Sequence, residues 1–292
     1  MDVTDSDPLD IQNGEATFSA SDGCRLFFRW SRPRRARGMV VVVHGLGEHS
    51  GRYGWLANSL TAEGIAFYGF DQRGHGRSGG CRGDVRSFGD YLDDLAAFER
   101  EVRKREPSMP LFLMGHSLGA IVAVLYAFDH QSKLAGLIAA SGAFQLASEP
   151  GRVPLAAARL LSSFAPCLTR GNGLKPEELS GDPDVIAAFR ADPLIGHKVT
   201  VRWVTEFFDN YKQAICRAAE LHLPLLVLHG RADRIARVDG SEAFFNAAGS
   251  SDKTLHIYPG LHHELYNEEA SGRRKVFADL LGWLQTHAGS AH

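Results

Sequence analysis

The sequence predicts an α/β fold with a mostly parallel central sheet flanked by helices. Strand-like and helix-like stretches alternate along the first half of the chain, and the alternation resumes near Leu223. This order is typical of a parallel sheet covered by helices. The expected strands are continuous apolar runs, such as Met39–Val43, which indicate burial on both faces of the sheet. We therefore expect one domain that spans residues 1–292.

The elements of the first half follow from local patterns. Two β-like stretches around Ser21-Asp22-Gly23 predict a hairpin within Thr17–Trp30. Apolar residues recur at helical spacing within Phe88–Arg105 and predict an amphipathic helix. The other expected elements are a strand over Met39–Val43, a helix over Trp55–Glu63 that ends at Gly64, a strand over Ile65–Phe70, a strand that begins at Leu111, a helix through Ile121–Phe128 and a strand over Leu134–Ala140.

The pattern changes between about residues 145 and 218, where no buried strand is evident. Helical stretches broken by Pro and Gly cover Val153–Leu168, Pro183–Arg190 and Val199–Tyr211. We expect a helical cap inserted over the ends of the strands. The stretch Leu155–Phe164 has an apolar stripe with Arg159 as its single charge. It either packs on the core or forms a lid that lines an acyl pocket or contacts a lipid surface, because amphipathicity alone does not identify what the apolar face meets.

The α/β pattern closes the chain. The expected elements are a strand over Leu223–Leu228, a helix over Gly240–Ala248, a strand over Thr254–Tyr258 and a helix over Glu269–Thr286. In such sheets ligands bind at the carboxyl ends of the strands. The polar loops His44–Arg52 and Asp71–Gly80, together with Ser117, all follow expected strands and should meet at that edge.

Ser117 lies in a Gly-X-Ser-X-Gly sequence between an expected strand and an expected helix. Gly115 and Gly119 lack side chains where the strand and helix backbones crowd, and the hydroxyl projects from a strained turn. This context is that of a nucleophile elbow.

A serine hydroxyl needs a base to remove its proton during attack, and an acid that orients the base. Asp233 follows the expected strand Leu223–Leu228, and histidines follow the last strand, so the chain has the order serine, acid, histidine of this architecture. The backbone N–H groups of Leu118 and Leu46 are the expected donors to the substrate oxyanion.

Composition excludes several function classes. The net charge of -2 gives no electrostatic case for nucleic-acid binding. The first ten residues carry four Asp and no basic residue, unlike a signal peptide, and no apolar run approaches the ~20 residues of a membrane span. The four cysteines form no Cys-X-X-Cys, and we expect reduced thiols in a cytoplasmic protein, although the sequence leaves one disulfide open.

Other binding motifs fit poorly. Gly45-Leu46-Gly47 opens a dinucleotide-type pattern, but Ser50 stands where the third glycine belongs, so we expect no cofactor. His262-His263-Glu264 lacks the ligand spacing of a metal site, and none is expected. His75 lies in a glycine-dense loop, where we prefer a structural turn tied by Asp71 and Arg73 over a catalytic base.

The chain resembles the monoacylglycerol lipases, α/β-hydrolase-fold serine hydrolases grouped with bacterial lysophospholipases. The likeness spans nearly the whole chain and is carried by His44-Gly45-Leu46-Gly47-Glu48-His49-Ser50-Gly51-Arg52-Tyr53, Asp71-Gln72-Arg73-Gly74-His75-Gly76-Arg77-Ser78, Gly115-His116-Ser117-Leu118-Gly119, Leu228-His229-Gly230-Arg231-Ala232-Asp233 and Tyr258-Pro259-Gly260-Leu261-His262-His263-Glu264. It implies that the catalytic histidine is His263 and that His262 lies at the pocket rim.

The resemblance also implies a lipid ester substrate, hydrolysed to fatty acid and glycerol through an acyl-enzyme on Ser117. Glu48 and Arg52 then organise the polar end of the pocket, with a loop-fixing ion pair as the alternative. Leu118 and Ala120 stand where the family often has Met and Gly, and Tyr266 where mammalian members often have His, which leaves head-group specificity open. A lysophospholipase, a short- or medium-chain carboxylesterase and a non-catalytic scaffold remain alternatives; oligomeric state and peripheral membrane contact through the cap stay open.

Overall fold

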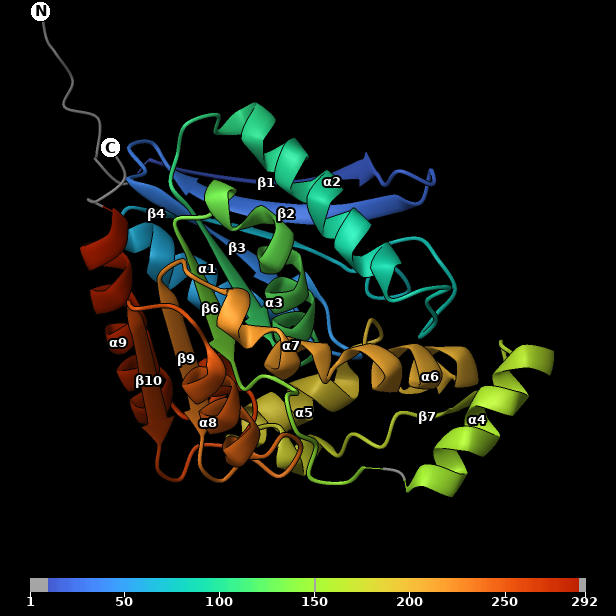
Figure 1. Cartoon of the computed structure of the whole chain (residues 1–292). Coiled ribbons are helices and arrows are strands. Elements are labelled where there is room, and N and C mark those ends of the chain that lie inside the picture. The colour runs from blue at the N-terminus through green and yellow to red at the C-terminus, as the bar shows by residue number, and fades with distance from the viewer. Residues whose placement is uncertain (1–9, 150, 289–292) are drawn as a thin grey trace, which may run out of the picture.

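The computed structural model describes residues 10–149 and 151–288, so nearly all of the acidic amino terminus lies outside it. Within this range eight strands form one sheet in the order β1-β2-β4-β3-β5-β6-β9-β10 (Figure 1). The strands are β1 Ile11–Ser19, β2 Arg25–Pro33, β3 Gly38–Val43, β4 Ile65–Phe70, β5 Leu111–His116, β6 Gly136–Ala140, β9 Leu225–Gly230 and β10 Lys253–Tyr258. Strands β4 to β10 along this sheet pair in parallel, whereas β2 is antiparallel to both β4 and β1. The predicted mostly parallel sheet and the amino-terminal hairpin are confirmed.

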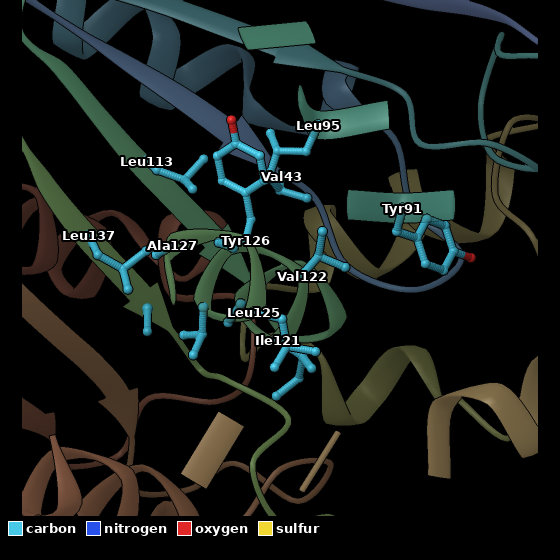
Figure 2. Packing of buried hydrophobic residues seen from close by; sticks show 14 of the residues in the cluster. Val43, Tyr91, Leu95, Leu113, Ile121, Val122, Leu125, Tyr126, Ala127 and Leu137 are labelled. Carbon is cyan, nitrogen blue, oxygen red and sulfur yellow. The ribbon is translucent and has the colours of Figure 1, made fainter. Parts of the chain in front are cut away.

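The central strands are apolar throughout because helices cover both faces of the sheet. Successive side chains of a strand point to opposite faces. Val41 and Val43 of β3 accordingly join the core on one face, and Val40 and Val42 join the core on the other. Figure 2 shows the core that contains Val43. There the apolar side chains of residues 121–127 lie between strand residues such as Leu113 and the side chains of Tyr91 and Leu95.

The flanking helices lie where the sequence predicts them. Helices α1 (Gly54–Ala62) and α9 (Ala270–Ala288) contribute to the core with Val40 and Val42. Helices α2 (Gly89–Arg105), α3 (Leu118–His130) and α8 (Val238–Ala247) contribute to the opposite core. The apolar face predicted for α2 is the buried one and includes Tyr91, Leu95, Phe98 and Val102.

Residues 145–218, called the cap segment below, lie between β6 and β9. Their elements are α4 Arg152–Phe164, β7 Thr169–Gly171, η3 Pro176–Glu178, α5 Pro183–Ala191, β8 Lys198–Thr200, α6 Val201–Asn210 and α7 Gln213–Cys216, followed by η4 Ala218–Glu220. The expectation of helices alone is wrong, because β7 and β8 pair as an antiparallel ribbon. The ribbon is held to the core loop after β4, where the N–H of Thr200 donates to the carbonyl of Gly83 at 2.9 Å.

Helix α4 contacts α6 and stands away from the central sheet (Figure 1). The stripe expected over Leu155–Phe164 does not lie on one buried face. Leu155 and Ala158 are half-buried and line a cavity, whereas Leu160 is 65% exposed and Phe164 82% exposed. None of the helix's described residues is fully buried or belongs to either core of the sheet, so the helix does not pack on the core.

Candidate active site

Ser117 occupies the turn between β5 and α3, with the backbone angles φ 54° and ψ -115°. A non-glycine residue with positive φ is strained, and such strain persists only where the surroundings enforce it. Here the crowding is severe: a Cβ on Gly115 would lie 2.2 Å from the carbonyl oxygen of Gly119, and a Cβ on Gly119 would lie 2.1 Å from that of Val43. Both glycines are therefore required for the turn that projects the Ser117 side chain.

Asp233 and His263 meet beside this turn, although they follow different strands. The Nδ1 atom of His263 lies 2.6 Å from Oδ2 of Asp233. Asp233 follows β9, His263 follows β10, and β9 and β10 are parallel neighbours, so the two loops leave the same edge of the sheet. The pair leaves Nε2 as the ring nitrogen of His263 that is free to face a substrate.

Several donors hold the Asp233 carboxylate in place. Its Oδ1 atom accepts the N–H groups of Ile235 and Ala236, at 2.8 Å and 3.0 Å, and Nε2 of His229 lies 3.2 Å from Oδ2. Burial alone would raise the pKa of Asp233, but the charge of His263 and hydrogen bonds from His229 and His263 bring the pKa below its usual value. Asp233 therefore stays ionised at neutral pH.

The two adjacent histidines of the last loop have different partners. His263 faces Asp233, whereas Nδ1 of His262 lies 2.9 Å from Oε1 of Glu268. The side chain of His262 is 27% exposed, against 3% for that of His263. The geometry thus brings Asp233 together with His263 and not with His262.

Two cavities meet at Ser117. The larger, of about 430 Å³, is lined by Leu46, Leu118 and Leu155 together with apolar residues of α6, including Trp203 and Phe207. The smaller, of about 20 Å³, is lined by residues that include Ser117, His263, Glu48 and Glu264. Ser117 and His263 therefore share a cavity wall, and an apolar chamber opens from the same serine.

The backbone N–H groups of Leu46 and Leu118 carry no hydrogen bond to any acceptor in the described residues. Leu118 is the first residue of α3, where N–H groups have no intrahelical partner. Both residues line the larger cavity beside Ser117. These amides are available to a substrate oxygen at that position.

Glu48 and Arg52 are buried in a network of charges. Glu48 Oε1 accepts the N–H of Gly45 at 2.5 Å and the hydroxyl of Tyr53 at 3.0 Å. Arg52 donates to Glu264 at 2.5 Å, and its guanidinium lies 4.9 Å from the centre of the Phe189 ring. Nε of Arg52 lies 3.9 Å from Oε2 of Glu48, so the two residues form an ion pair; Glu48 lines the smaller cavity, and Arg52 lines neither cavity.

Two buried histidines near the site were missed by sequence reasoning. His229, the penultimate residue of β9, supports Asp233 as described above. His116, the last residue of β5, lies with its Nδ1 atom 2.7 Å from Oε1 of Glu48. The available signal was position: each lies at the carboxyl end of a buried strand, where side chains approach the site.

The glycine-dense loop after β4 is structural, as expected. His75 is fully buried, and burial lowers its pKa to about 4, so the ring is neutral. Asp71 accepts the N–H groups of Ser50 and Arg77, each at 2.8 Å, while Nε and one terminal nitrogen of Arg73 each donate to Asp94 at 2.6 Å. Asp71 and Arg73 thus tie the loop to separate neighbours rather than to each other.

Within residues 10–149 and 151–288, no three metal-ligating side chains gather into a site. No helix in the same ranges is both long and apolar enough to cross a membrane. All four cysteines are free thiols.

A strained serine at a strand-to-helix turn, on an eight-stranded sheet of this order, defines a serine hydrolase with the α/β-hydrolase fold. Comparisons with known proteins refine this class. The family model described as "Serine aminopeptidase, S33" matches residues 34–270. The chain is 32% identical to the monoacylglycerol lipase of Mycolicibacterium smegmatis over 275 residues, which are 94% of this chain and 97% of that protein.

Solved structures agree. The crystal structure of the Paleococcus ferrophilus monoacylglycerol lipase has a TM-score of 0.79 and 32% identity, over 94% of this chain and 99% of that one. A soluble variant of the Saccharomyces cerevisiae monoglyceride lipase, solved with a substrate analog, has a TM-score of 0.83 and 25% identity, over 94% of each chain. The chain belongs to the monoacylglycerol lipase family, and it is a carboxylic ester hydrolase.

Proposed function

We propose that this protein hydrolyses monoacylglycerols to fatty acid and glycerol through an acyl-enzyme on Ser117. The observation that carries the proposal is the bond between His263 and Asp233 next to a strained serine that opens into an apolar chamber. The family relatives named above as monoacylglycerol lipases support the choice of substrate.

In the first half of the reaction, Ser117 Oγ attacks the ester carbonyl carbon while His263 Nε2 takes the hydroxyl proton. Asp233, ionised and bonded to Nδ1, holds the imidazole in the productive tautomer and stabilises its charged form. The N–H groups of Leu46 and Leu118 hold the oxyanion, and each such donor is worth about 3 kcal/mol. Collapse of the intermediate breaks the bond to glycerol, which leaves with the proton from His263.

In the second half, water attacks the acyl carbon and His263 takes its proton. Ser117 then leaves with that proton, and the fatty acid is released. The acyl chain occupies the larger cavity, because the walls supplied by Leu155, Trp203 and Phe207 are apolar. Glycerol faces Glu48, whose Oε1 has three donors already, whereas Oε2 faces only Nε of Arg52 at 3.9 Å, so Oε2 is the atom that accepts a glycerol hydroxyl.

We further propose that the cap segment meets the lipid that supplies the substrate. Its helix α4 has a cavity-lining side with Leu155 and Ala158, and an outer side on which Val153, Leu160 and Phe164 are 80%, 65% and 82% exposed. A helix with such an apolar outer face suits transient contact with a membrane surface. The free thiols fit a cytoplasmic location for the enzyme.

The catalytic proposal is tested with S117A and the wild-type protein on monoacylglycerols, lysophospholipids and p-nitrophenyl esters of graded chain length. We expect a wild-type preference for monoacylglycerols, near-complete loss of turnover in S117A, and fluorophosphonate labelling of the wild type alone. Full activity of S117A, or a wild type that does not label, would refute an acyl-enzyme on Ser117. A preference for lysophospholipids or acetyl esters would refute the substrate while leaving the serine mechanism in place.

The membrane proposal is tested by flotation with lipid vesicles. The variant L160S/F164S should bind vesicles less than wild type and keep its rate on a short water-soluble ester. Wild-type flotation by this variant would contradict contact through α4.

A further inference from the structure

His116 directly precedes Ser117, and the mechanism above gives it no task. Its ring is buried in the wall of the smaller cavity and faces two oxygen atoms from two other loops. Nδ1 lies 2.7 Å from Oε1 of Glu48, and Nε2 lies 3.2 Å from the backbone carbonyl oxygen of His263. A carboxylate and a carbonyl accept hydrogen bonds and donate none. Both ring nitrogens of His116 therefore need a hydrogen.

Glu48 is in its ionised form in this arrangement. The same Oε1 atom that faces His116 also accepts the N–H of Gly45 and the hydroxyl of Tyr53. Burial alone would raise the pKa of Glu48, but the charge of His116 and its hydrogen bond lower it below the usual value. The ionised Glu48 therefore cannot donate a hydrogen bond to the ring of His116.

A neutral imidazole has one N–H and one acceptor nitrogen. Placed between two acceptors, it would leave one buried nitrogen lone pair directed at an oxygen lone pair, which is costly where water cannot intervene. His116 is only 6% exposed. The imidazolium form, with two N–H donors, satisfies both contacts at once.

The charges around His116 balance only when it is a cation. Glu48 and Glu264 are the nearby acids, and Arg52 is the nearby base, 2.5 Å from Glu264. Burial lowers the pKa of His44, and its Nε2 accepts the N–H of Gln72 at 2.9 Å, so His44 is neutral. The cluster of two acids and Arg52 then lacks one positive charge, which His116 supplies. Tyr53 and the ring of His263, 4.8 Å away between ring centres, complete its surroundings.

We propose that His116 is held as an imidazolium and is a positioning residue that fastens three loops into one catalytic geometry. It belongs to the elbow, its Nε2 holds the loop of His263, and through Glu48 it holds the turn at Gly45, which precedes the oxyanion amide of Leu46. The inference rests on the proposed function only in taking His263 as the base. A shift of about 1 Å in a catalytic group costs on the order of 100-fold in rate, which sets the scale of the effect.

The pH dependence follows from the sign of the shift. Burial alone would lower the pKa of His116, but the charge of Glu48 and its hydrogen bond raise the pKa above the usual value. The network is therefore complete below that raised pKa and is lost as the pH rises through it. Above that pH the carbonyl of His263 loses its donor, and kcat should fall while KM changes little.

The protonation state is measured on the full-length protein labelled with ¹⁵N-histidine. The variant H116Q, which lacks one set of ring signals, identifies those of His116. We expect both ring nitrogens to have imidazolium shifts at pH 7, where an unperturbed histidine is largely neutral. In E48Q these shifts should become those of a neutral ring. A neutral ring for His116 in the wild type at pH 7 would overturn the proposal.

The positioning role is measured by kcat and KM against pH on a p-nitrophenyl ester, with S117A as the blank. H116Q should lower kcat 10- to 100-fold and lose the alkaline fall expected for the wild type. The matched control is H287Q, since His287 also pairs with a carboxylate, that of Asp252, but lies on α9 and lines neither cavity. Its profile should equal that of the wild type.

An H116Q profile that keeps the wild-type alkaline fall would show a structural role only and would overturn the proposal. If H116Q fails to fold, the double variant E48Q/H116Q, which leaves no unpaired buried charge, replaces it in the same measurement. If the wild type hydrolyses no ester, the proposed function fails, but the ring shifts of His116 still decide its charge.

Discussion

The backbone N–H of Glu264 donates to the carbonyl of Leu179 at 2.7 Å, which ties the loop that carries His263 to the cap segment. Two further bonds reinforce the tie: Ser180 Oγ donates to the carbonyl of Asn267 at 2.7 Å, and the N–H of Gly181 donates to Glu268 at 3.0 Å. The part of the cap segment near η3 and α5 is therefore hydrogen-bonded to the loop of His263, whereas α4 takes no part in these bonds.

The buried ion pair between Arg52 and Glu264 should matter far more for stability than an exposed one. E264Q leaves the buried guanidinium of Arg52 with only the more distant carboxylate of Glu48, 3.9 Å away, and should lower the free energy of unfolding by about 3 kcal/mol. The control is E177Q, which breaks the pair of Arg190 and Glu177, whose side chains are more than half exposed, and should cost under about 1 kcal/mol. Urea unfolding of both variants measures the difference, and equal losses would contradict the assignment.

The elbow glycines should be intolerant of any side chain. G119A places a methyl group 2.1 Å from the carbonyl oxygen of Val43, so the turn must open, and the protein should be strongly destabilised or fail to fold. G282A is the control, because a Cβ on Gly282 of α9 meets nothing within 4 Å. It should raise the free energy of unfolding by about 0.5–1 kcal/mol. Thermal unfolding distinguishes them, and a stable, active G119A would exclude the tight turn.

Asp233 should contribute both to kcat and to the pH dependence of the free energy of unfolding in acid. D233N should lower kcat by about 10⁴-fold, because the amide favours the wrong imidazole tautomer. The folded pKa of Asp233 is lowered, so its stabilising contribution is present at neutral pH and is lost as the pH falls through that folded pKa. The free energy of unfolding should therefore depend less on pH below about pH 4 in D233N than in wild type. Identical acid profiles would show that the carboxylate is not held ionised by its neighbours.

A bulky side chain should affect activity when it is placed on the cavity-lining side of α4 and not when it is placed on the exposed side. A158W fills the larger cavity from the cap and should lower kcat/KM for long acyl chains at least about 10-fold while sparing short ones, because a buried chain loses its space. A156W adds the same side chain at an exposed position two residues earlier and should leave both rates unchanged. Assays on monoacylglycerols of graded length test this, and equal losses on long and short chains would place the acyl chain elsewhere.

The sheet was predictable because helices cover both of its faces. Each central strand must therefore be apolar at every position, and such a run is visible in the sequence. Val40 to Val43 alternate between the two cores, as a strand covered on both faces requires. The ribbon of β7 and β8 was not predictable, since three exposed residues, Thr169–Gly171, give no pattern. The orientation of α4 could not be predicted either. The sequence shows which of its residues are apolar, but it does not show whether they face the core, a cavity or solvent.

The site shows the same limit. Ser117 was predictable from the residues next to it in the sequence. The choice between His262 and His263 rested on the family resemblance, because only the folded chain brings Asp233 next to one of the two. His116 was missed because its two partners lie 68 and 147 residues away. A residue whose role depends on distant backbone oxygens leaves no local pattern.

Helix α4 adds walls to the chamber and nothing to either core of the sheet. Substitutions in this helix should therefore cost less stability than substitutions in β3 or α3. Changes in the cavity-lining residues of α4 can therefore alter the preferred acyl chain while the elbow, the loops and the sheet stay unchanged.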